Sequence, residues 1–141
     1  MNSGQVLDVI GSLISTLKGF SAKLPPVVHL KAVPGGIKPK EEAVEAYEQA
    51  IYRFRDQSAS TPFRKFSVQF LESLEAFEQG NVLASVQPLL SVLDHLERMH
   101  RDKEIVVAAV DEKRMAEYRT SLNKVLPGNQ PELEGAGKGM V

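Results

Sequence analysis

The sequence predicts an all-α protein, a bundle of four or five mostly antiparallel helices, and three observations support this fold class. Apolar residues recur at intervals of three and four through most of the chain, which is the period of a helix with one buried face. Most connections between these periodic stretches are short, which favours antiparallel neighbours. Only residues 27–33 have the composition of a β-strand, and no second stretch is available to pair with them.

The composition is that of an ordinary globular domain. Hydrophobic residues make up 43% of the 141 residues and charged residues 25%. The 17 Lys and Arg residues nearly balance the 18 Asp and Glu residues, so no overall field favours nucleic acid or an acidic membrane. The absence of cysteine excludes disulfides, thiolate metal sites and cysteine nucleophiles.

No stretch has the features of a membrane span or a targeting signal. No apolar run approaches the ~20 residues that a transmembrane helix needs. Asp8 interrupts the apolar N-terminal stretch and no basic segment precedes it, so we expect no secretory signal. A mitochondrial presequence is not expected either, because the first arginine is Arg53. We therefore expect a cytoplasmic or organelle-internal protein.

The first predicted helix, within residues 1–20, is strongly amphipathic. Its opposite side carries Gly4, Gly11 and Gly19 with few charges, and each interior glycine costs about 1 kcal/mol relative to alanine. The helix should therefore depend on what it packs against: the core of its own chain, which we favour, a partner protein or a lipid surface. The candidate partner-binding residues are its apolar face, Val6, Leu7, Ile10, Leu13, Ile14, Leu17 and Phe20.

Two segments lack helical periodicity. Residues 21–38 form a linker punctuated by Pro25-Pro26 and by Pro34-Gly35-Gly36. We interpret its β-prone residues 27–33 as an extended strap over the bundle rather than as an edge strand for another chain. The tail, residues 127–141, contains four glycines and little apolar content, so we expect it to be flexible.

Residues 39–126 are predicted to form the helical body. Its first helix begins at Pro39 and ends between residues 57 and 60. The next begins after Thr61 as the N-cap and stops at Gly80. Its apolar positions follow helical spacing and are expected to be core rather than a ligand pocket: Phe63, Phe66, Phe70, Leu74 and Phe77.

The last two helices are predicted over residues 81–101 and 103–126. Asn81 is the expected cap of the former, and Pro88 either kinks it or lies in the first turn of a helix that begins at Ser85. Asp102 is the expected N-cap of the latter. Four apolar residues of its first turns are expected to face inward: Ile105, Val106, Ala109 and Val110.

The best candidate for a metal site lies between Asp94 and Asp102. Glu97 and His100 are three residues apart on one helical face, as in di-iron bundle sites, but no second Glu-x-x-His motif exists to complete such a site. We interpret this stretch as a solvated helix end whose basic residues complement the helix dipole. No metal is expected.

No motif points to catalysis or to a cofactor. His29 has no Ser, Asp or Glu close in sequence, and no nucleophile elbow is present. Residues 33–38 and 135–139 are rich in glycine but lack the spacing of a phosphate-binding loop. The sequence therefore predicts a protein that is not an enzyme.

Two basic clusters could contact nucleic acid. The first consists of Arg53, Arg55, Arg64 and Lys65, with the aromatic residues Tyr52 and Phe63 beside it. Acidic residues interleave with both clusters, so ordinary ion pairing on helix surfaces is favoured. The second cluster consists of Arg98, Arg101, Lys103, Lys113, Arg114, Arg119 and Lys124.

These observations favour a non-enzymatic interaction protein, an assembly subunit or adaptor. Its partners would be other protein chains, including copies of itself, bound through the N-terminal helix and the extensions, residues 1–38 and 127–141. One alternative is a coat, packaging or ribonucleoprotein component that uses the Arg53–Lys65 cluster. The other is a peripheral lipid-surface protein that acts through the N-terminal helix.

Overall fold

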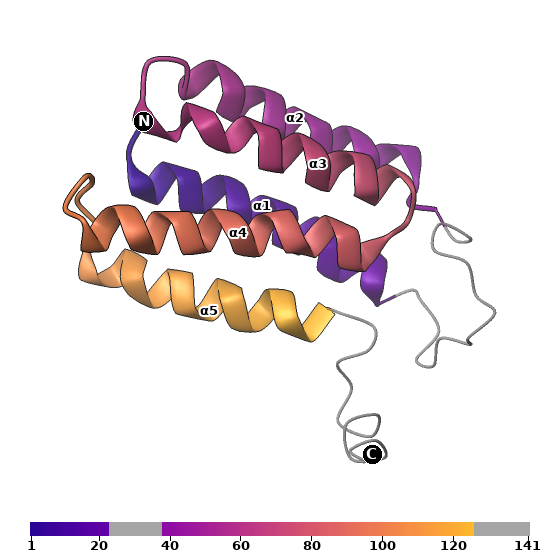
Figure 1. The fold of residues 1–141 in the computed structure, drawn as a ribbon. Coiled ribbons are helices and arrows are strands. Elements are labelled where there is room, and N and C mark those ends of the chain that lie inside the picture. Colours follow the sequence, from indigo (N-terminus) through magenta and orange to yellow (C-terminus); the bar gives the residue numbers. More distant parts are fainter. Residues whose placement is uncertain (23–37, 126–141) are drawn as a thin grey trace, which may run out of the picture.

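The computed structural model describes residues 1–22 and 38–125, and its regular secondary structure in these ranges is entirely helical (Figure 1). The all-α prediction is confirmed. The predicted strap, residues 27–33, and the glycine-rich tail lie outside the described residues. The helices are α1 (Ser3–Ser21), α2 (Glu41–Gln57), the 3-10 helix η1 (Pro62–Phe66), α3 (Ser67–Glu78), α4 (Val82–Arg101) and α5 (Ala109–Val125).

The five α-helices lie alongside one another, with α1 and α4 between a pair formed by α2 and α3 and the single helix α5 (Figure 1). Helix α3 packs mainly on α4, and α1 packs on α5, α2 and α4. The α2–α3 and α4–α5 connections lie at one end of the molecule, and the start of α2 and the α3–α4 turn lie at the other.

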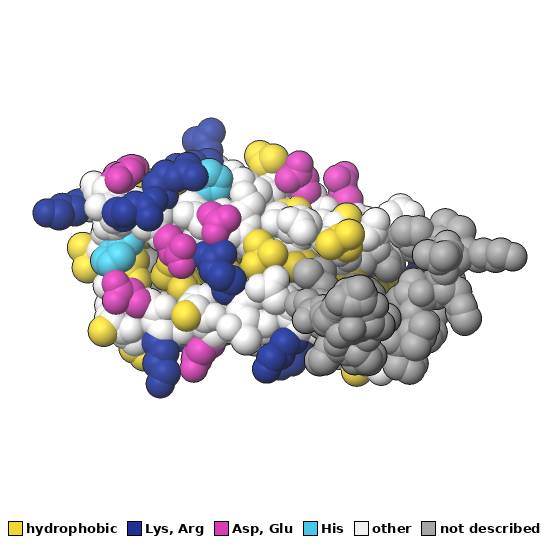
Figure 2. Space-filling view, turned by 60° about the horizontal axis from the view of Figure 1, so that its bottom comes forward, with side chains coloured by type: hydrophobic (Ala, Val, Ile, Leu, Met, Phe, Trp, Pro, Cys, Tyr) yellow, Lys and Arg dark blue, Asp and Glu magenta, His cyan; other side chains and the backbone are white. Residues whose placement is uncertain are grey.

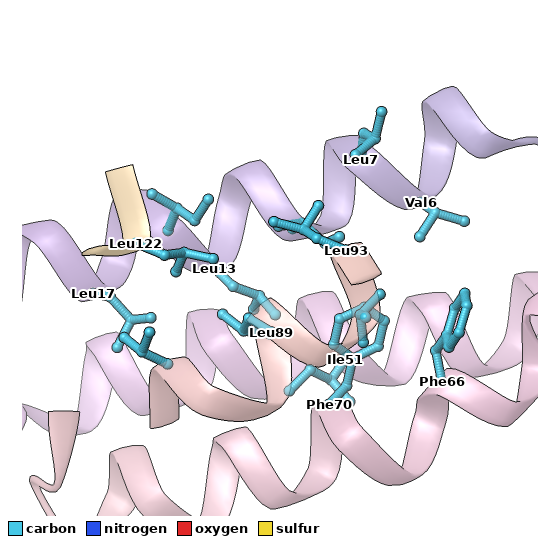
Figure 3. Close-up of a cluster of buried hydrophobic side chains, with 14 of the residues drawn as sticks. Val6, Leu7, Leu13, Leu17, Ile51, Phe66, Phe70, Leu89, Leu93 and Leu122 are labelled. Atoms are coloured by element: carbon cyan, nitrogen blue, oxygen red, sulfur yellow. The ribbon is translucent and has the colours of Figure 1, made fainter. Parts of the chain in front are cut away.

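All five α-helices contribute to one cluster of buried apolar side chains. Figure 3 shows Leu13 and Leu17 of α1 facing Leu89 and Leu93 of α4, with Leu122 of α5 beside them. The phenylalanines of η1 and α3 are buried as predicted, and the ring of Phe70 meets Phe54 of α2 edge-on at 4.7 Å between centroids. The buried phenylalanines of η1 and α3 are Phe63, Phe66, Phe70 and Phe77.

The glycine-containing face of α1 lets α5 approach closely. A Cβ atom at Gly11 would lie only 2.6 Å from the hydroxyl oxygen of Tyr118, so no larger residue fits there without displacing that ring. The N-terminus of α1 is closed by a capping box, in which Asn2 accepts from the Gln5 N–H and the Gln5 side chain accepts from the Asn2 N–H.

Side-chain caps fix the starts of η1 and α4. Thr61 accepts from the N–H of Phe63, as predicted, although the first turn is a 3-10 helix. Asn81 accepts from the N–H of Ala84, so α4 begins at Val82 and Pro88 lies inside it. The alternative start at Ser85 is therefore wrong, because the Asn81 cap stabilises the turn that precedes Pro88.

The start predicted for the last helix is also wrong. Asp102 is the C-cap of α4, not the N-cap of α5, and Lys103 follows it in the left-handed conformation with φ 63°. The N–H of Glu104 donates to the Met99 carbonyl and the N–H of Lys103 to the His100 carbonyl, the two bonds of a Schellman motif. Helix α5 begins only at Ala109. Three of the residues expected to face inward are consequently exposed: Val106, Ala109 and Val110.

Substitution of Phe70 tests whether α3 contributes to the core. Because its ring is fully buried and meets Phe54 of α2 edge-on, Phe70→Ala should lower the free energy of unfolding by about 3–5 kcal/mol. Chemical denaturation followed by circular dichroism measures this change. Val68→Ala is the control, because Val68 is 63% exposed and should change stability by less than about 0.5 kcal/mol. Similar losses for both variants would contradict the assignment.

The two Schellman turns give a second prediction. Lys103→Gly should raise the free energy of unfolding by up to about 1 kcal/mol, because glycine adopts the left-handed conformation without a Cβ clash. Gly80 has φ 76° at the equivalent position after α3, so Gly80→Ala should lower stability by about 1 kcal/mol. Thermal melting of both variants checks these opposite signs, and a loss in Lys103→Gly would refute the strain argument.

Candidate functional site

The α4–α5 connection carries an exposed apolar segment, residues 105–110, with the sequence Ile-Val-Val-Ala-Ala-Val. Val106 is 89% exposed and Val110 65% exposed, and the two alanines between them are exposed as well. Val107 is buried, and Ile105 is half-buried against the core. Four exposed apolar residues close together in one segment, rather than scattered singly over the surface, are typical of a binding surface.

This segment is held in place by contacts with α1 and α5. The hydroxyl of Ser3 donates to the Val106 carbonyl at 3.0 Å, which ties the start of α1 to the segment. The Ala108 carbonyl accepts from the N–H groups of Asp111 and Glu112, and so begins α5. The segment is therefore a fixed surface at the end of the molecule.

The apolar face of α1, predicted to bind a partner, lies inside this chain. Figure 3 shows Leu13 and Leu17 turned toward α4 and α5. These side chains could reach a partner only if α1 left the other helices. The buried set is Val6, Leu7, Ile10, Leu13, Ile14, Leu17 and Phe20.

The structure brings the first basic cluster together at the α2–α3 connection. Its four side chains are exposed, and none forms an ion pair with another described residue. Arg55 lies over the ring of Tyr52 at 4.8 Å, but Phe63 is buried and offers no surface for stacking. The cluster consists of Arg53, Arg55, Arg64 and Lys65.

The members of the second basic cluster have different surroundings. Arg119 of α5 binds Asp94 at 2.7 Å and Glu97 at 2.9 Å, so two of the candidate metal ligands form ion pairs across α4 and α5. His100 contacts Glu112 at 2.6 Å. Within residues 1–22 and 38–125, no group of three or more His, Asp and Glu side chains is placed to hold a metal ion.

Several sequence candidates fall outside what the structure describes. His29, the glycine-rich residues 135–139 and most of residues 33–38 belong to the undescribed ranges. Among the helices that the structure does describe, none combines the length and apolar character needed to cross a membrane.

A polar contact that the sequence did not predict joins α1 and α5. Arg114 binds Asp8 at 2.7 Å and Asp111 at 3.1 Å, and it also donates to the hydroxyl of Tyr118. Burial lowers the pKa of Arg114, but the hydrogen bonds to Tyr118, Asp8 and Asp111 outweigh burial and raise it above its ordinary value. A depression of about 420 Å³ lies beside this contact. The guanidinium of Arg114 is already bound to Asp8, Asp111 and Tyr118, so we interpret the contact as structural.

The one buried tyrosine hydroxyl takes part in a hydroxyl network that joins α2, α3 and α4. Tyr47 hydrogen bonds to Ser73 and, at 3.2 Å, to Ser85. Ser73 donates to the Ser85 carbonyl at 2.7 Å, and Ser85 donates to the Ser73 carbonyl at 3.0 Å. Burial raises the pKa of Tyr47 to about 12, against smaller lowering effects of the two serines. Because these groups are enclosed, they fix the packing of the three helices and cannot reach a substrate.

Tyr47 should make stability fall at high pH. A group whose folded pKa is about 12 and whose unfolded pKa is about 10 stabilises the fold fully below pH 10, and that contribution is lost as the pH rises toward 12. The loss should approach about 3 kcal/mol, since each pKa unit corresponds to about 1.4 kcal/mol. Tyr47→Phe should remove this fall, whereas Tyr52→Phe, a change at an exposed ring, should keep it. Urea unfolding between pH 9 and pH 12, at about one-unit steps, measures both. An equally steep fall in Tyr47→Phe would disprove the assignment.

Comparison of the chain with family models, curated proteins and solved structures finds no match, so the argument for its function rests on its own residues.

Proposed function

We propose that the chain is a non-enzymatic helical interaction protein, an assembly subunit or adaptor that binds other protein chains. The observation that carries the proposal is the exposed apolar segment, residues 105–110. Covering one fully exposed valine side chain removes enough apolar surface to contribute about 1.5–3 kcal/mol. A partner that covers Val106 and Val110 together would therefore gain a substantial part of its binding free energy there.

In this proposal the five helices form a mostly antiparallel bundle that acts as the rigid body of an assembly. The N-terminal helix contributes in two ways: its apolar face stabilises the body, and its first residues lie beside the binding segment through the bond from Ser3 to Val106. Residues 23–37 and 127–141 would supply further contacts to neighbouring chains.

Substitution of Val106 tests this proposal. Because the side chain is 89% exposed, Val106→Asp should leave the melting temperature unchanged while it reduces partner binding about tenfold or more. The matched control is Val68→Asp, which places the same charge at another exposed valine. Affinity capture from cells that express each form, quantified by mass spectrometry, compares the proteins retained. Identical sets for the two variants, or no retained protein with the unmodified chain, would refute the proposal.

A further inference from the structure

The exposed charges on α2, η1, α3 and α4 separate toward opposite ends of the molecule. One end, which we call the basic end, carries Arg53, Arg55, Arg64, Lys65, Arg98 and Arg101. The opposite end, which we call the acidic end, carries Glu41, Glu42, Glu45, Glu75 and Glu78. Figure 2 shows Lys and Arg side chains, with some Asp and Glu side chains among them, toward the left end of the molecule, where the α2–α3 and α4–α5 connections lie in Figure 1.

On α2, η1, α3, α4 and the residues that flank them, each end keeps an excess of its own sign, and Lys103 adds to the basic end. Asp56, Asp102 and Glu104 lie at the basic end, and Lys38 and Lys40 lie at the acidic end. The ion pairs of the described residues involve other side chains, so the eleven charges that define the two ends remain unpaired among the described residues. The basic end is continuous across elements, because Phe66 of η1 packs against His95 of α4 with ring centroids 6.0 Å apart.

Local stability does not explain the charges on η1 and α3. Acidic residues stabilise the start of a helix and basic residues its end, because of the helix dipole. Helix α2 follows this rule, with Glu41 and Glu42 in its first turn and Arg55 in its last. Helix α3 reverses it, with Arg64 and Lys65 of η1 just before its start and Glu75 and Glu78 toward its end. These charges oppose the local dipole, which points to a role outside the helix.

The two ends cannot neutralise each other within one molecule. Helix α2 has 17 residues and is therefore about 25 Å long. Salt at 0.1 M screens charges beyond about 10 Å. A surface of opposite charge must therefore come from another molecule, and every copy of this chain carries one.

We propose that the chain associates with further copies of itself head to tail, the basic end of one copy facing the acidic end of the next. The occupant is a second copy because the two surfaces are complementary in sign and present in equal number on every molecule. Such an interface is heterologous, so it leaves one free end of each kind on a pair and can add further copies. This inference rests on the proposed role as an assembly subunit but uses surfaces other than residues 105–110.

Sedimentation velocity of the full chain provides the first test. At about 50 mM NaCl the unmodified protein should form concentration-dependent assemblies, and raising the salt to about 300 mM should weaken association about tenfold or more, because screening grows with ionic strength. A monomer at the lower salt over the whole concentration range overturns the inference. That outcome leaves the proposed function intact, because the Val106→Asp comparison addresses a different surface.

Paired charge reversals provide the decisive test. Arg64→Glu/Lys65→Glu removes the positive excess of the basic end, and Glu75→Lys/Glu78→Lys removes the negative excess of the acidic end. Each double variant alone should remain monomeric, and an equal mixture of the two should associate again. Both reversals agree with the helix dipole, so circular dichroism should show unchanged helix content and melting temperatures that are equal or higher.

The control is Lys18→Glu/Lys124→Glu, which changes net charge as much as the basic-end reversal. Lys18 and Lys124 are exposed in the last turns of α1 and α5, away from the basic end, so this variant keeps the basic end intact, makes the opposite end more acidic and should still associate. Failure of the mixture to associate, or equal loss in the control, overturns the inference. Binding of a single-stranded DNA oligonucleotide that is lost in Arg64→Glu/Lys65→Glu, without self-association of the unmodified chain, would also overturn it and assign the basic end to nucleic acid.

Discussion

The burial of the apolar face of α1 is the interaction on which the rest of the structure depends. This helix packs on α2, α4 and α5, and its largest apolar side chains are enclosed. The rest of its surface is rich in glycine and serine, so the isolated helix would be marginal and its neighbours must stabilise it. In return α1 covers the inner face of α5, whose buried residues include Met115 and Leu122. The first and last described helices therefore stabilise each other.

Polar contacts supply the geometric precision that apolar packing lacks. The hydroxyl network around Tyr47 satisfies the buried hydroxyls of Ser73 and Ser85 only when α2, α3 and α4 hold one relative position. The bond from Arg114 to Asp8 does the same for α1 and α5 at a more exposed position, and Asp111 of α5 holds the same guanidinium. Small residues such as Gly11 and Ser85 permit these approaches because they leave room for a neighbouring ring.

Most of the helical architecture could be predicted from the sequence because it depends on local signals. The spacing of apolar residues located α1, α2 and α3, and the caps Thr61 and Asn81 placed two of the starts. The start of α5 was missed because the turn uses Lys103 in the left-handed conformation, where glycine is the usual signal. The pairs Arg119–Asp94 and Tyr47–Ser73 join separate helices, and no local pattern predicts such contacts.

The exposure of the proposed binding segment, residues 105–110, was not predicted from the sequence because of the same turn. Helical periodicity placed Val106 and Val110 on an inward face, and the turn at Lys103 changes their register so that they reach the surface. The charge separation could not be predicted from the composition, because the total charge is close to zero. It arises because helices that run in opposite directions bring charged residues from distant parts of the sequence to the same end of the molecule. Both surfaces arise from how the helices are arranged rather than from any single motif.

The capping box at the N-terminus has a practical consequence for recombinant work. Asn2 uses both its side chain and its backbone N–H in this box, Met1 packs against the core, and Ser3 bonds to the segment that contains Val106. A purification tag or fluorescent protein fused ahead of Met1 would sit directly beside the apolar surface and could mask it. Fusions that report on binding should therefore be attached after Val141, and tags at the front should be removed by a protease.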